Sequence, residues 1–327
     1  MKKRILISLL MICFGFGLLI PTTPVMAKSA QIKLGVQPWL GYGPWWIAEQ
    51  QGFFKKHNLD VKVVNFTWDA DMGAAVASGN VQVIAAATNF LIAVRNQDID
   101  LQGFLVLDAS YEADAILAPT SIKSISDLTG KAVAYEAGST SDLLLNYALK
   151  ENGMALKDVK PVQMGAADAG LALIAGRVDV AVTYEPYISS ALSQGKEFHV
   201  LYTAAQRPGL ISDIAVADAK FIKNNTAAIK ALILAWDDAV TFLKEHPAEG
   251  GKIIADAVHS PMDEFKVAME GVRVYGLQGN NDILAGKFQK TMLDIGQIMM
   301  ETNPKEIKKL PNPDQALDVQ MVRELAQ

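Results

Sequence analysis

The sequence is poor in cysteine, in histidine and in clustered basic residues. Its 327 residues include one cysteine, Cys13, and four histidines. Cys13 lies inside an apolar run near the N-terminus, so we expect it to be removed with a cleaved leader. The remaining chain would then contain neither a disulfide nor thiol chemistry. The histidines are scattered singly, without the spacing of metal ligands, so we predict no metal site and no cofactor.

Enzyme motifs and nucleic-acid-binding features are also missing. Gly130-Lys131 lacks the earlier glycine of a P-loop, and no G-x-S-x-G segment occurs. The first 27 residues carry three of the 30 basic residues and none of the 35 acidic ones, so the chain after Ala27 has a net charge of −8. An acidic chain without a basic cluster is a poor partner for nucleic acids. We therefore predict a protein that is not an enzyme and does not bind nucleic acid.

The N-terminal segment has the pattern of a secretory signal peptide. A basic start at residues 2–4 precedes an apolar run of 16 residues, 5–20, and Val25 and Ala27 occupy the small-residue positions of a cleavage site. The run is short for a membrane span, which needs about 20 residues. We predict cleavage after Ala27 and export to the periplasm. An uncleaved N-terminal anchor is the alternative.

A loop rich in glycine, proline and aromatic residues follows a short apolar strand at residues 32–36. Pro44 suits the first turn of a helix, where its missing N–H is not needed, and Gly52 suits the end of that helix. The loop at residues 37–43 should then lie at the C-terminal end of a strand, where open α/β sheets bind ligands. We expect at least one of its aromatic residues to line a pocket and the others to be core. These residues are Trp39, Tyr42, Trp45 and Trp46.

An alanine-rich helix followed by a buried strand occurs twice, at residues 73–87 and at residues 171–183. Both strand runs are almost continuously apolar, which is typical of parallel strands covered on both faces. The strands begin 97 residues apart, at Val81 and Val178. This spacing predicts one such unit in each of two α/β lobes. The alternative is that the common βαβ pattern recurs here by chance.

Two further strands place the crossings between the lobes. The strand at residues 103–108 continues through 109–112 into the second lobe, and the strand at residues 213–217 returns from it. Two crossings imply a hinge and a cleft that closes on a ligand. We predict that residues 28–108 and 213–327 form the first lobe and residues 109–212 the second. Amphipathic helices should cover the outside at residues 224–246, 261–275 and 285–301.

Six segments together form a recognisable set of motifs: residues 32–36, 46–54, 59–64, 125–134, 138–141 and 184–187. They resemble the periplasmic substrate-binding proteins of ABC importers for nitrate, taurine and aliphatic sulfonates. That family also includes binders of thiamine-precursor pyrimidines. The likeness extends to about Ala217 and more loosely beyond it. It implies a type II-like two-lobed fold, a small-molecule solute, and a membrane permease with its ATPase as partners; we expect a monomer.

The resemblance also implies a pocket built from loops at strand ends. Three of these loops precede helices, whose first N–H groups are available to an anion. N-capping is the alternative role for each hydroxyl. The implied ligand-binding residues are Gln37, Trp39, Tyr42, Thr88, Asn89, Asp108, Tyr111, Asp114, Gly138, Ser139, Thr140, Ser141, Tyr184 and Glu185.

The charges of these loops disfavour a simple anion. Six acids occur there without a lysine or arginine, and Arg207 is the nearest basic candidate. An amine, an amidine or a protonatable ring would suit such a pocket, and a taurine-like zwitterion would suit both the acids and the helix ends. We favour Glu185 and Asp108 as ligand acids, with solvation or capping as the alternative for each acid. The six are Asp108, Glu112, Asp114, Glu136, Glu185 and Asp213.

The predicted function is an extracytoplasmic solute-binding protein of an ABC importer. Its solute would be a small sulfonate, a taurine-like compound or another nitrogen-containing organic molecule. A binder of a cationic, pyrimidine or amidine ligand is the first alternative. An enzyme on the same scaffold is the second, since some pyrimidine synthases and a chorismate-type dehydratase resemble this fold.

Overall fold

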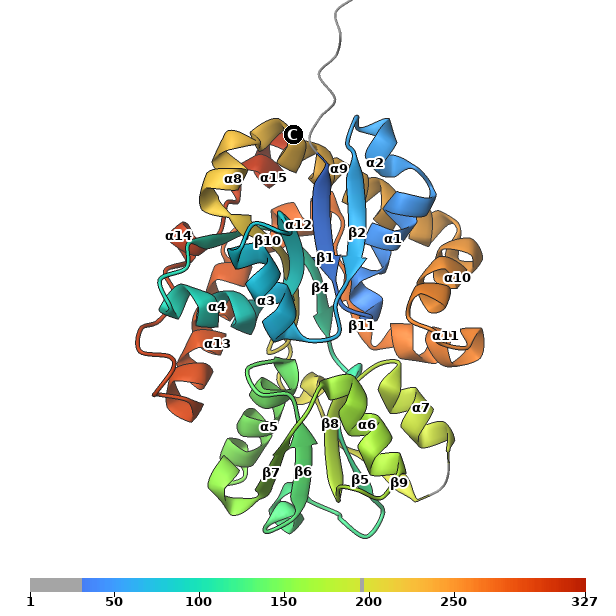
Figure 1. Cartoon of the computed structure of the whole chain (residues 1–327), viewed down its shortest axis with the longest axis vertical. Coiled ribbons are helices and arrows are strands. Elements are labelled where there is room, and N and C mark those ends of the chain that lie inside the picture. Colours follow the sequence, from blue (N-terminus) through green and yellow to red (C-terminus); the bar gives the residue numbers. More distant parts are fainter. Residues whose placement is uncertain (1–30, 195–196) are drawn as a thin grey trace, which may run out of the picture. The chain divides into compact units, whose positions relative to one another are not determined.

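The computed structural model describes residues 31–194 and 197–327, whose strands form two separate β-sheets (Figure 1). The predicted signal peptide, with Cys13 and the cleavage site after Ala27, lies outside the described residues. The six-stranded sheet contains, in spatial order, β11 (Val272–Val274), β4 (Leu101–Ser110), β10 (Ser212–Asp218), β3 (Val83–Ala87), β1 (Ile32–Val36) and β2 (Val61–Asn65). The five-stranded sheet contains β7 (Lys160–Gln163), β6 (Ala132–Tyr135), β8 (Val180–Tyr184), β5 (Asp114–Pro119) and β9 (Phe198–Thr203).

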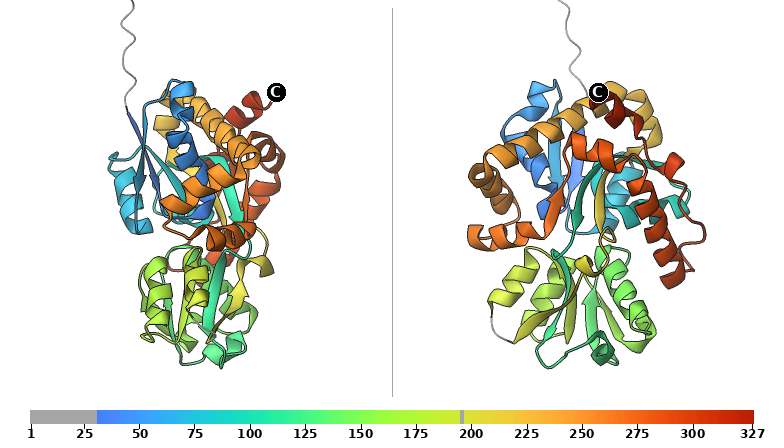
Figure 2. Two further views of the ribbon diagram at one scale, coloured as in Figure 1. Left: turned by 90° about the vertical axis from the view of Figure 1, so that its right-hand side faces the viewer. Right: turned by 180° about the vertical axis from the view of Figure 1, so that it is seen from behind.

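Helices cover both sheets, and each sheet with its helices is one lobe, which confirms the predicted two-lobed α/β class (Figures 1 and 2). Around the first, six-stranded sheet lie α1 (Gly43–Gln50), α2 (Phe53–Lys56), α3 (Asp69–Ala77), α4 (Thr88–Asn96), α8 (Ala219–Asn224), α9 (Thr226–Glu245), α10 (Pro247–Ala257), α11 (Met262–Glu270), α12 (Leu277–Ile283), α13 (Lys287–Thr302), α14 (Pro313–Ala316) and α15 (Gln320–Leu325). Around the second lie α5 (Thr140–Glu151), α6 (Ala166–Ile174) and α7 (Tyr187–Ser193). Short 3₁₀ turns are η1 (Leu40–Tyr42), η2 (Ile125–Leu128), η3 (Leu156–Asp158) and η4 (Ala204–Gln206).

The chain passes from one sheet to the other twice. β4 belongs to the first sheet and β5, which begins four residues after β4 ends, belongs to the second. β9 is the last strand of the second sheet, and β10 returns to the first, where it lies antiparallel between β3 and β4. Both crossings therefore pass close to the same strand ends.

The two similar helix–strand units each contribute a central strand to a different sheet. β3 and β8 are buried along their whole lengths, as their apolar runs predict. The prediction that their neighbours are parallel is right on one side only. β3 pairs parallel with β1 but antiparallel with β10, and β8 pairs parallel with β6 but antiparallel with β5. An apolar run indicates that a strand is buried on both faces, but it does not show whether the neighbouring strand is parallel or antiparallel.

The helix predicted at residues 261–275 was too long. α11 ends at Glu270, and the next residues form the edge strand β11, which pairs with β4. The change occurs at Gly271, where a Cβ would lie 2.9 Å from the backbone nitrogen of Ala113. The close approach brings Gly271 O to the N–H of Tyr111 at 2.9 Å. A three-residue strand held by tertiary pairing has no periodicity that a sequence pattern would reveal.

The segment that follows β1 is fixed by the core of the first lobe. Pro44 lies in the first turn of α1, and Gly52 follows its end with a φ of 75°, as predicted. Trp45 is fully buried, and its ring centroid lies 4.7 Å from that of Trp236 on α9. This packing anchors α1 and so places the preceding loop, residues 37–42, against the strand ends. In the described part of the chain, no helix is both long and apolar enough to cross a membrane.

Candidate ligand-binding site

A cavity lies where strand ends of the two sheets meet. Its wall comes from the loop after β1, η1, the end of β3, the start of β5, the loop after β6, the end of β8 and the start of β10. The lining residues are Gln37, Trp39, Tyr42, Ala87, Asp114, Glu136, Ser139, Thr140, Tyr184, Ile211 and Asp213. Both lobes contribute, as expected for a ligand cleft between them.

Half of the residues predicted from the sequence lie on this wall. They are Gln37, Trp39, Tyr42, Asp114, Ser139, Thr140 and Tyr184. The other predicted residues lie outside the lining set, most of them one layer behind it: Thr88, Asn89, Asp108, Tyr111, Gly138, Ser141 and Glu185. Four lining residues were not predicted as ligand contacts: Ala87, Glu136, Ile211 and Asp213. Two of these four, Glu136 and Asp213, carry a sequence signal, because both belong to the excess of acids in the loops.

Trp39 joins the two lobes at the cavity. Its indole Nε1 donates a hydrogen bond to Asp108 Oδ1 at 3.1 Å, on the first sheet. Its ring meets the ring of Tyr184, on the second sheet, edge to face at a centroid distance of 5.8 Å. Tyr184 in turn packs edge-on against Tyr187 at 5.5 Å. The hydrogen bond fixes the orientation of the indole, so its face and the Tyr184 ring form a rigid aromatic wall.

Asp213 and Asp108 form a buried pair of carboxyls on neighbouring strands. They lie opposite each other in the ladder of β10 and β4, and both are nearly inaccessible, at 3% and 0% exposed. Burial raises the pKa of Asp213 to about 6, although the hydroxyl of Tyr42 donates to its Oδ1 at 2.8 Å. Burial and the neighbouring Asp213 raise the pKa of Asp108 well above its usual range. Asp108 Oδ2 has no hydrogen-bond donor among the described residues.

Asp114 supplies a third buried carboxyl, from the first residue of β5. It is 3% exposed and lies opposite Tyr184 in the ladder with β8. Burial raises its pKa to about 7, while the nearby hydroxyls of Ser110 and Thr140 act in the opposite direction. Near neutral pH the site therefore holds carboxyls that are poised between their neutral and charged forms.

The loop after β6 is held by its own hydroxyls. Ser139 is the N-cap of α5: its Oγ accepts the N–H of Ser141 at 3.1 Å and donates to the carbonyl of Glu136 at 2.9 Å. Ser141 Oγ accepts the N–H of Glu136 at 2.9 Å. Glu136 Oε2 accepts the N–H of Ala166 at 3.2 Å. The capping alternative thus applies to Ser139, and Ser141 is used within the loop. Ser139 and Thr140 both border the cavity, with Thr140 beside Asp114.

The second predicted loop, at the start of α4, lies behind the wall. Thr88 Oγ1 donates to the carbonyl of Ser212 at 2.9 Å, which ties α4 to β10. Asn89 Nδ2 donates to the carbonyl of Gly138 at 3.2 Å and so links the first lobe to the second. These two residues therefore support the walls of the cavity.

Glu185 and Tyr111 have partners away from the cavity wall. The carboxylate of Glu185 accepts the N–H and the hydroxyl of Ser189, both at 2.9 Å, and burial raises its pKa. Tyr111 is half-buried beside β11. A direct ligand contact by Glu185, Asp108 or Tyr111 stays a prediction. Asp114 and Asp213 are acids on the wall itself.

No lysine, arginine or histidine is among the eleven lining residues. Arg207, the nearest basic candidate in the sequence, is 46% exposed and pairs with Asp294 at 3.6 Å instead. Among residues 31–194 and 197–327, no group of histidines, cysteines and acids has the geometry of a metal site. The site is therefore an aromatic and acidic cavity without a basic counter-charge.

Two α/β lobes, two crossings and a cavity at the strand ends define the periplasmic-binding-protein fold. The chain belongs to the family described as NMT1/THI5 like, whose profile matches residues 41–250. The family resemblance predicted from the sequence motifs is thereby confirmed.

Named relatives differ in what they bind or do. A segment of 74 residues, 23% of this chain, is 42% identical to a provisionally named aliphatic sulfonates-binding protein of Escherichia coli (strain K12), and it spans only 23% of that protein. The taurine-binding periplasmic protein of the same strain is 25% identical over 255 residues, 76% of this chain and 80% of that one. A 4-amino-5-hydroxymethyl-2-methylpyrimidine phosphate synthase of Candida albicans (strain WO-1) is 24% identical over 63% of this chain and 64% of its own.

Solved structures agree with this fold. The periplasmic aliphatic sulphonate binding protein of Escherichia coli superposes with a TM-score of 0.69 at 21% identity, covering 88% of this chain and 96% of its own. The periplasmic nitrate-binding protein of Synechocystis PCC 6803 superposes with a TM-score of 0.68 at 16% identity, covering 91% and 88%. At such identities the likeness establishes the fold, and the solute has to be argued from the cavity.

Proposed function

We propose that this protein is the extracytoplasmic solute-binding component of an ABC importer. It binds one small organic solute, a sulfonate, a taurine-like compound or another nitrogen-containing molecule, and delivers it to a permease coupled to an ATPase. The observation that carries this proposal is the cavity between the lobes, walled by Trp39 and Tyr42 from one lobe and Tyr184 from the other. Taurine-binding and aliphatic sulphonate-binding relatives with the same fold support it.

The proposal also states that the protein is exported and that it binds its solute without catalysing a reaction. The leader at residues 1–27 directs the chain to the periplasm and is cleaved after Ala27. The mature protein is a monomer whose lobes, residues 28–108 with 213–327 and residues 109–212, close over the solute without changing it. The pyrimidine synthase among the relatives makes an enzyme the competing function. Asp114 and Asp213, with pKa values of about 7 and about 6, are the cavity groups that an enzyme would use as general acid or base, so the test includes the fate of the solute.

The test is a thermal-shift screen of the protein produced with its own leader and purified from a bacterial periplasm. N-terminal sequencing should find Lys28 as the first residue. The panel contains taurine, alkanesulfonates, nitrate, aminopyrimidines, amines and amidines. A true solute at a hundredfold excess over its dissociation constant should stabilise the protein by about 2.7 kcal/mol.

A matched variant separates the cavity from the rest of the surface. Trp39→Ala removes the aromatic wall and should abolish the thermal shift, whereas Trp68→Ala, at a partly exposed tryptophan that does not line the cavity, should retain it. The proposal fails if the protein stays in the cytoplasm. It also fails if the solute is consumed during incubation.

A further inference from the structure

We propose, building on the solute-binding function above, that the cavity selects solutes with a positively charged nitrogen, such as a protonated amine or an amidinium, bound by the Asp114 and Asp213 carboxylates. The family relatives named for sulfonate, taurine or nitrate would lead one to expect an anion. The lining of this cavity indicates the opposite charge for at least one end of the solute. A nitrogen cation with several N–H groups could donate to both carboxylates at once.

The balance of charge at the wall carries this inference. Three of the eleven lining residues are acids, Asp114, Glu136 and Asp213, and none is basic. Asp108 adds a fourth carboxyl directly behind the wall, opposite Asp213 in the β-ladder. Buried carboxylates are normally paired with a cation or a metal ion. Since the described chain offers neither a basic residue at the wall nor a metal cluster, a carboxylate that ionises here can gain a full positive counter-charge from the solute.

Helix N-termini at the wall supply less charge than the acids. α1, α4 and α5 begin beside the cavity, at Gly43, Thr88 and Thr140, and each helix end is equivalent to about half a positive charge. Together they offset between about one and two carboxylates. With Asp114 and Asp213 both ionised, the wall remains negative. With both protonated, the helix ends dominate and the wall would instead favour an anion.

Because protonation of Asp114 and Asp213 reverses the favoured solute charge, the pH dependence of binding shows which charge the cavity selects. Asp114 and Asp213 have pKa values of about 7 and about 6, so both titrate near neutral pH. The titratable and charged groups around them all come from the cavity loops or the adjacent strands. They are Tyr42 on η1, Asp108 on β4, Glu136 after β6, Tyr184 and Glu185 at the end of β8, and Arg273 and Tyr275 at β11. Arg273 forms a hydrogen bond with Tyr275.

The aromatic wall agrees with the same solute class. Trp39, Tyr42 and Tyr184 surround the space beside the two carboxyls. Faces of tryptophan and tyrosine attract a cation within about 6 Å of the ring centroid. The bonds from Trp39 Nε1 to Asp108 and from the Tyr42 hydroxyl to Asp213 hold these rings in place. The wall therefore complements an organic cation by both charge and shape.

The test compares affinities at about pH 8 and about pH 5.5 for acetamidinium, benzamidinium, agmatine, taurine, ethanesulfonate and nitrate. We expect at least one cation to bind, with an affinity that rises about tenfold or more with pH over this range. Asp114→Asn and Asp213→Asn, which keep the side-chain shape, should each weaken that binding about tenfold or more at the higher pH. Asp179→Asn removes the same charge at the start of β8, where Asp179 is exposed, and should leave it unchanged.

The possible outcomes separate this inference from the proposed function. Taurine binding without ethanesulfonate binding supports it, because the two differ by the amino group. Ethanesulfonate or nitrate binding that is tighter at about pH 8 than the binding of every cation tested overturns the inference and leaves the solute-binding function intact. If no probe binds, mass spectrometry of the solute released by denaturing the purified protein decides: an organic cation supports the inference and a purely anionic solute overturns it. With neither binding nor release, the proposed function fails as well.

Discussion

Gly41 occupies a position where the close packing of the site leaves no room for a side chain. A Cβ there would lie 2.2 Å from Asp108 Oδ2 and 2.4 Å from Trp39 Nε1. We expect Gly41→Ala to separate Trp39 from Asp108, to lower the free energy of unfolding by about 1–3 kcal/mol, and to weaken solute binding about tenfold. Urea unfolding and calorimetric titration measure both effects.

A glycine in an open environment is the control for this substitution. Gly279 lies in α12, and a Cβ there would meet its nearest atom, Tyr275 Cδ1, at an ordinary 3.4 Å. Gly279→Ala should be neutral or stabilise the protein by up to about 1 kcal/mol, through the lower entropy of the unfolded chain. Equal effects of the two substitutions would contradict the tight packing inferred around Gly41.

The raised pKa values of Asp114 and Asp213 predict how stability depends on pH. Both lie above the unfolded value of about 3.9, so between that pH and about pH 7 the folded protein holds protons that the unfolded chain has released. The contribution of these groups to stability is then largest at acidic pH and is lost as the pH rises through 6 and 7. We expect the ligand-free protein to lose about 4 kcal/mol from this source between about pH 5 and about pH 8, since one pKa unit corresponds to about 1.4 kcal/mol.

The same reasoning fixes the sign of a substitution effect. Asp213→Asn and Asp114→Asn remove the cost of an ionised buried carboxyl, so each should raise the melting temperature of the ligand-free protein at about pH 8 while weakening solute binding. Melting curves of the wild type and both variants across the pH range measure this. Variants that melt below the wild type at the higher pH would contradict it.

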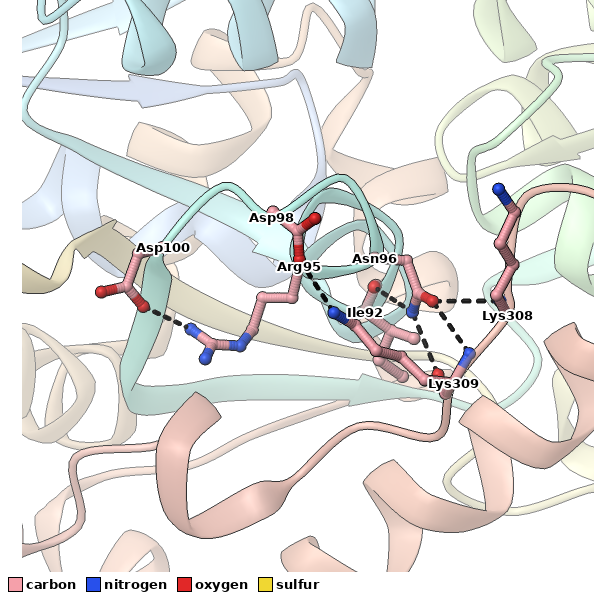
Figure 3. A network of polar contacts seen from close by, with 7 residues as sticks. All are labelled: Ile92, Arg95, Asn96, Asp98, Asp100, Lys308 and Lys309. Atoms are coloured by element: carbon pink, nitrogen blue, oxygen red, sulfur yellow. Dashed lines mark hydrogen bonds and ion pairs between the residues drawn. The ribbon is translucent and has the colours of Figure 1, made fainter.

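At the scale of single elements, Asn96 at the end of α4 holds the segment that leads to α14 (Figure 3). Its Nδ2 donates to the carbonyls of Ile92 and Lys309, both at 3.1 Å, and its Oδ1 accepts the N–H groups of Lys308 and Lys309 at 3.0 and 3.1 Å. Asn96→Ala should cost about 1–3 kcal/mol of unfolding free energy, because it removes four hydrogen bonds that tie this segment to α4. Solute affinity should not change, since this clamp does not line the cavity.

An ion pair in the same network provides the control. Lys309 Nζ pairs with Asp98 at 2.9 Å, and both side chains are more than half exposed. Lys309→Ala keeps the backbone bonds of the clamp and should cost less than about 1 kcal/mol. If it costs as much as Asn96→Ala in urea unfolding, the side-chain clamp is not what holds this segment.

The elements that the sequence predicted best are those with a local cause. The strand at residues 32–36, the proline-started α1 and the capped α5 all follow from patterns within about ten residues. β11 and the antiparallel position of β10 next to β3 were not predictable in this way. Both depend on partners more than 100 residues away, and local periodicity carries no information about them.

The candidate site was predictable to the level of its loops. The aromatic loop after the first strand led to Trp39 and Tyr42, and the family resemblance implied Asp114 and Tyr184; all four lie on the cavity wall. They did not distinguish Asp213 on the wall from Asp108 one layer behind it, because that difference depends on the register of β10 against β4. The sequence also did not reveal that the carboxylate of Glu185 accepts hydrogen bonds from Ser189 in α7 and not from the cavity side.

At the scale of the whole molecule, an aromatic contact and a surface ion pair are two of the contacts that join the lobes. Trp39 and Tyr184 meet at the cavity, whereas Lys150 on α5 pairs with Glu301 on α13 at the surface, with both side chains about 40% exposed. We expect Lys150→Gln to change solute affinity less than about threefold, because exposed ion pairs contribute about 0–1 kcal/mol. Tyr184→Ala should weaken it about tenfold or more, because it removes a buried aromatic contact. Equal effects in calorimetric titrations would mean that the surface pair controls closure.

The central claim is that the cavity binds the charged nitrogen of a solute through carboxylates that ionise as it enters. Calorimetric titration of the wild-type protein at about pH 6.5, in two buffers of different ionisation enthalpy, measures the number of protons exchanged on binding. This account predicts a net release of up to about two protons per solute, which decreases in Asp114→Asn and Asp213→Asn. Proton uptake on binding, or equal binding enthalpies in the two buffers, would contradict it.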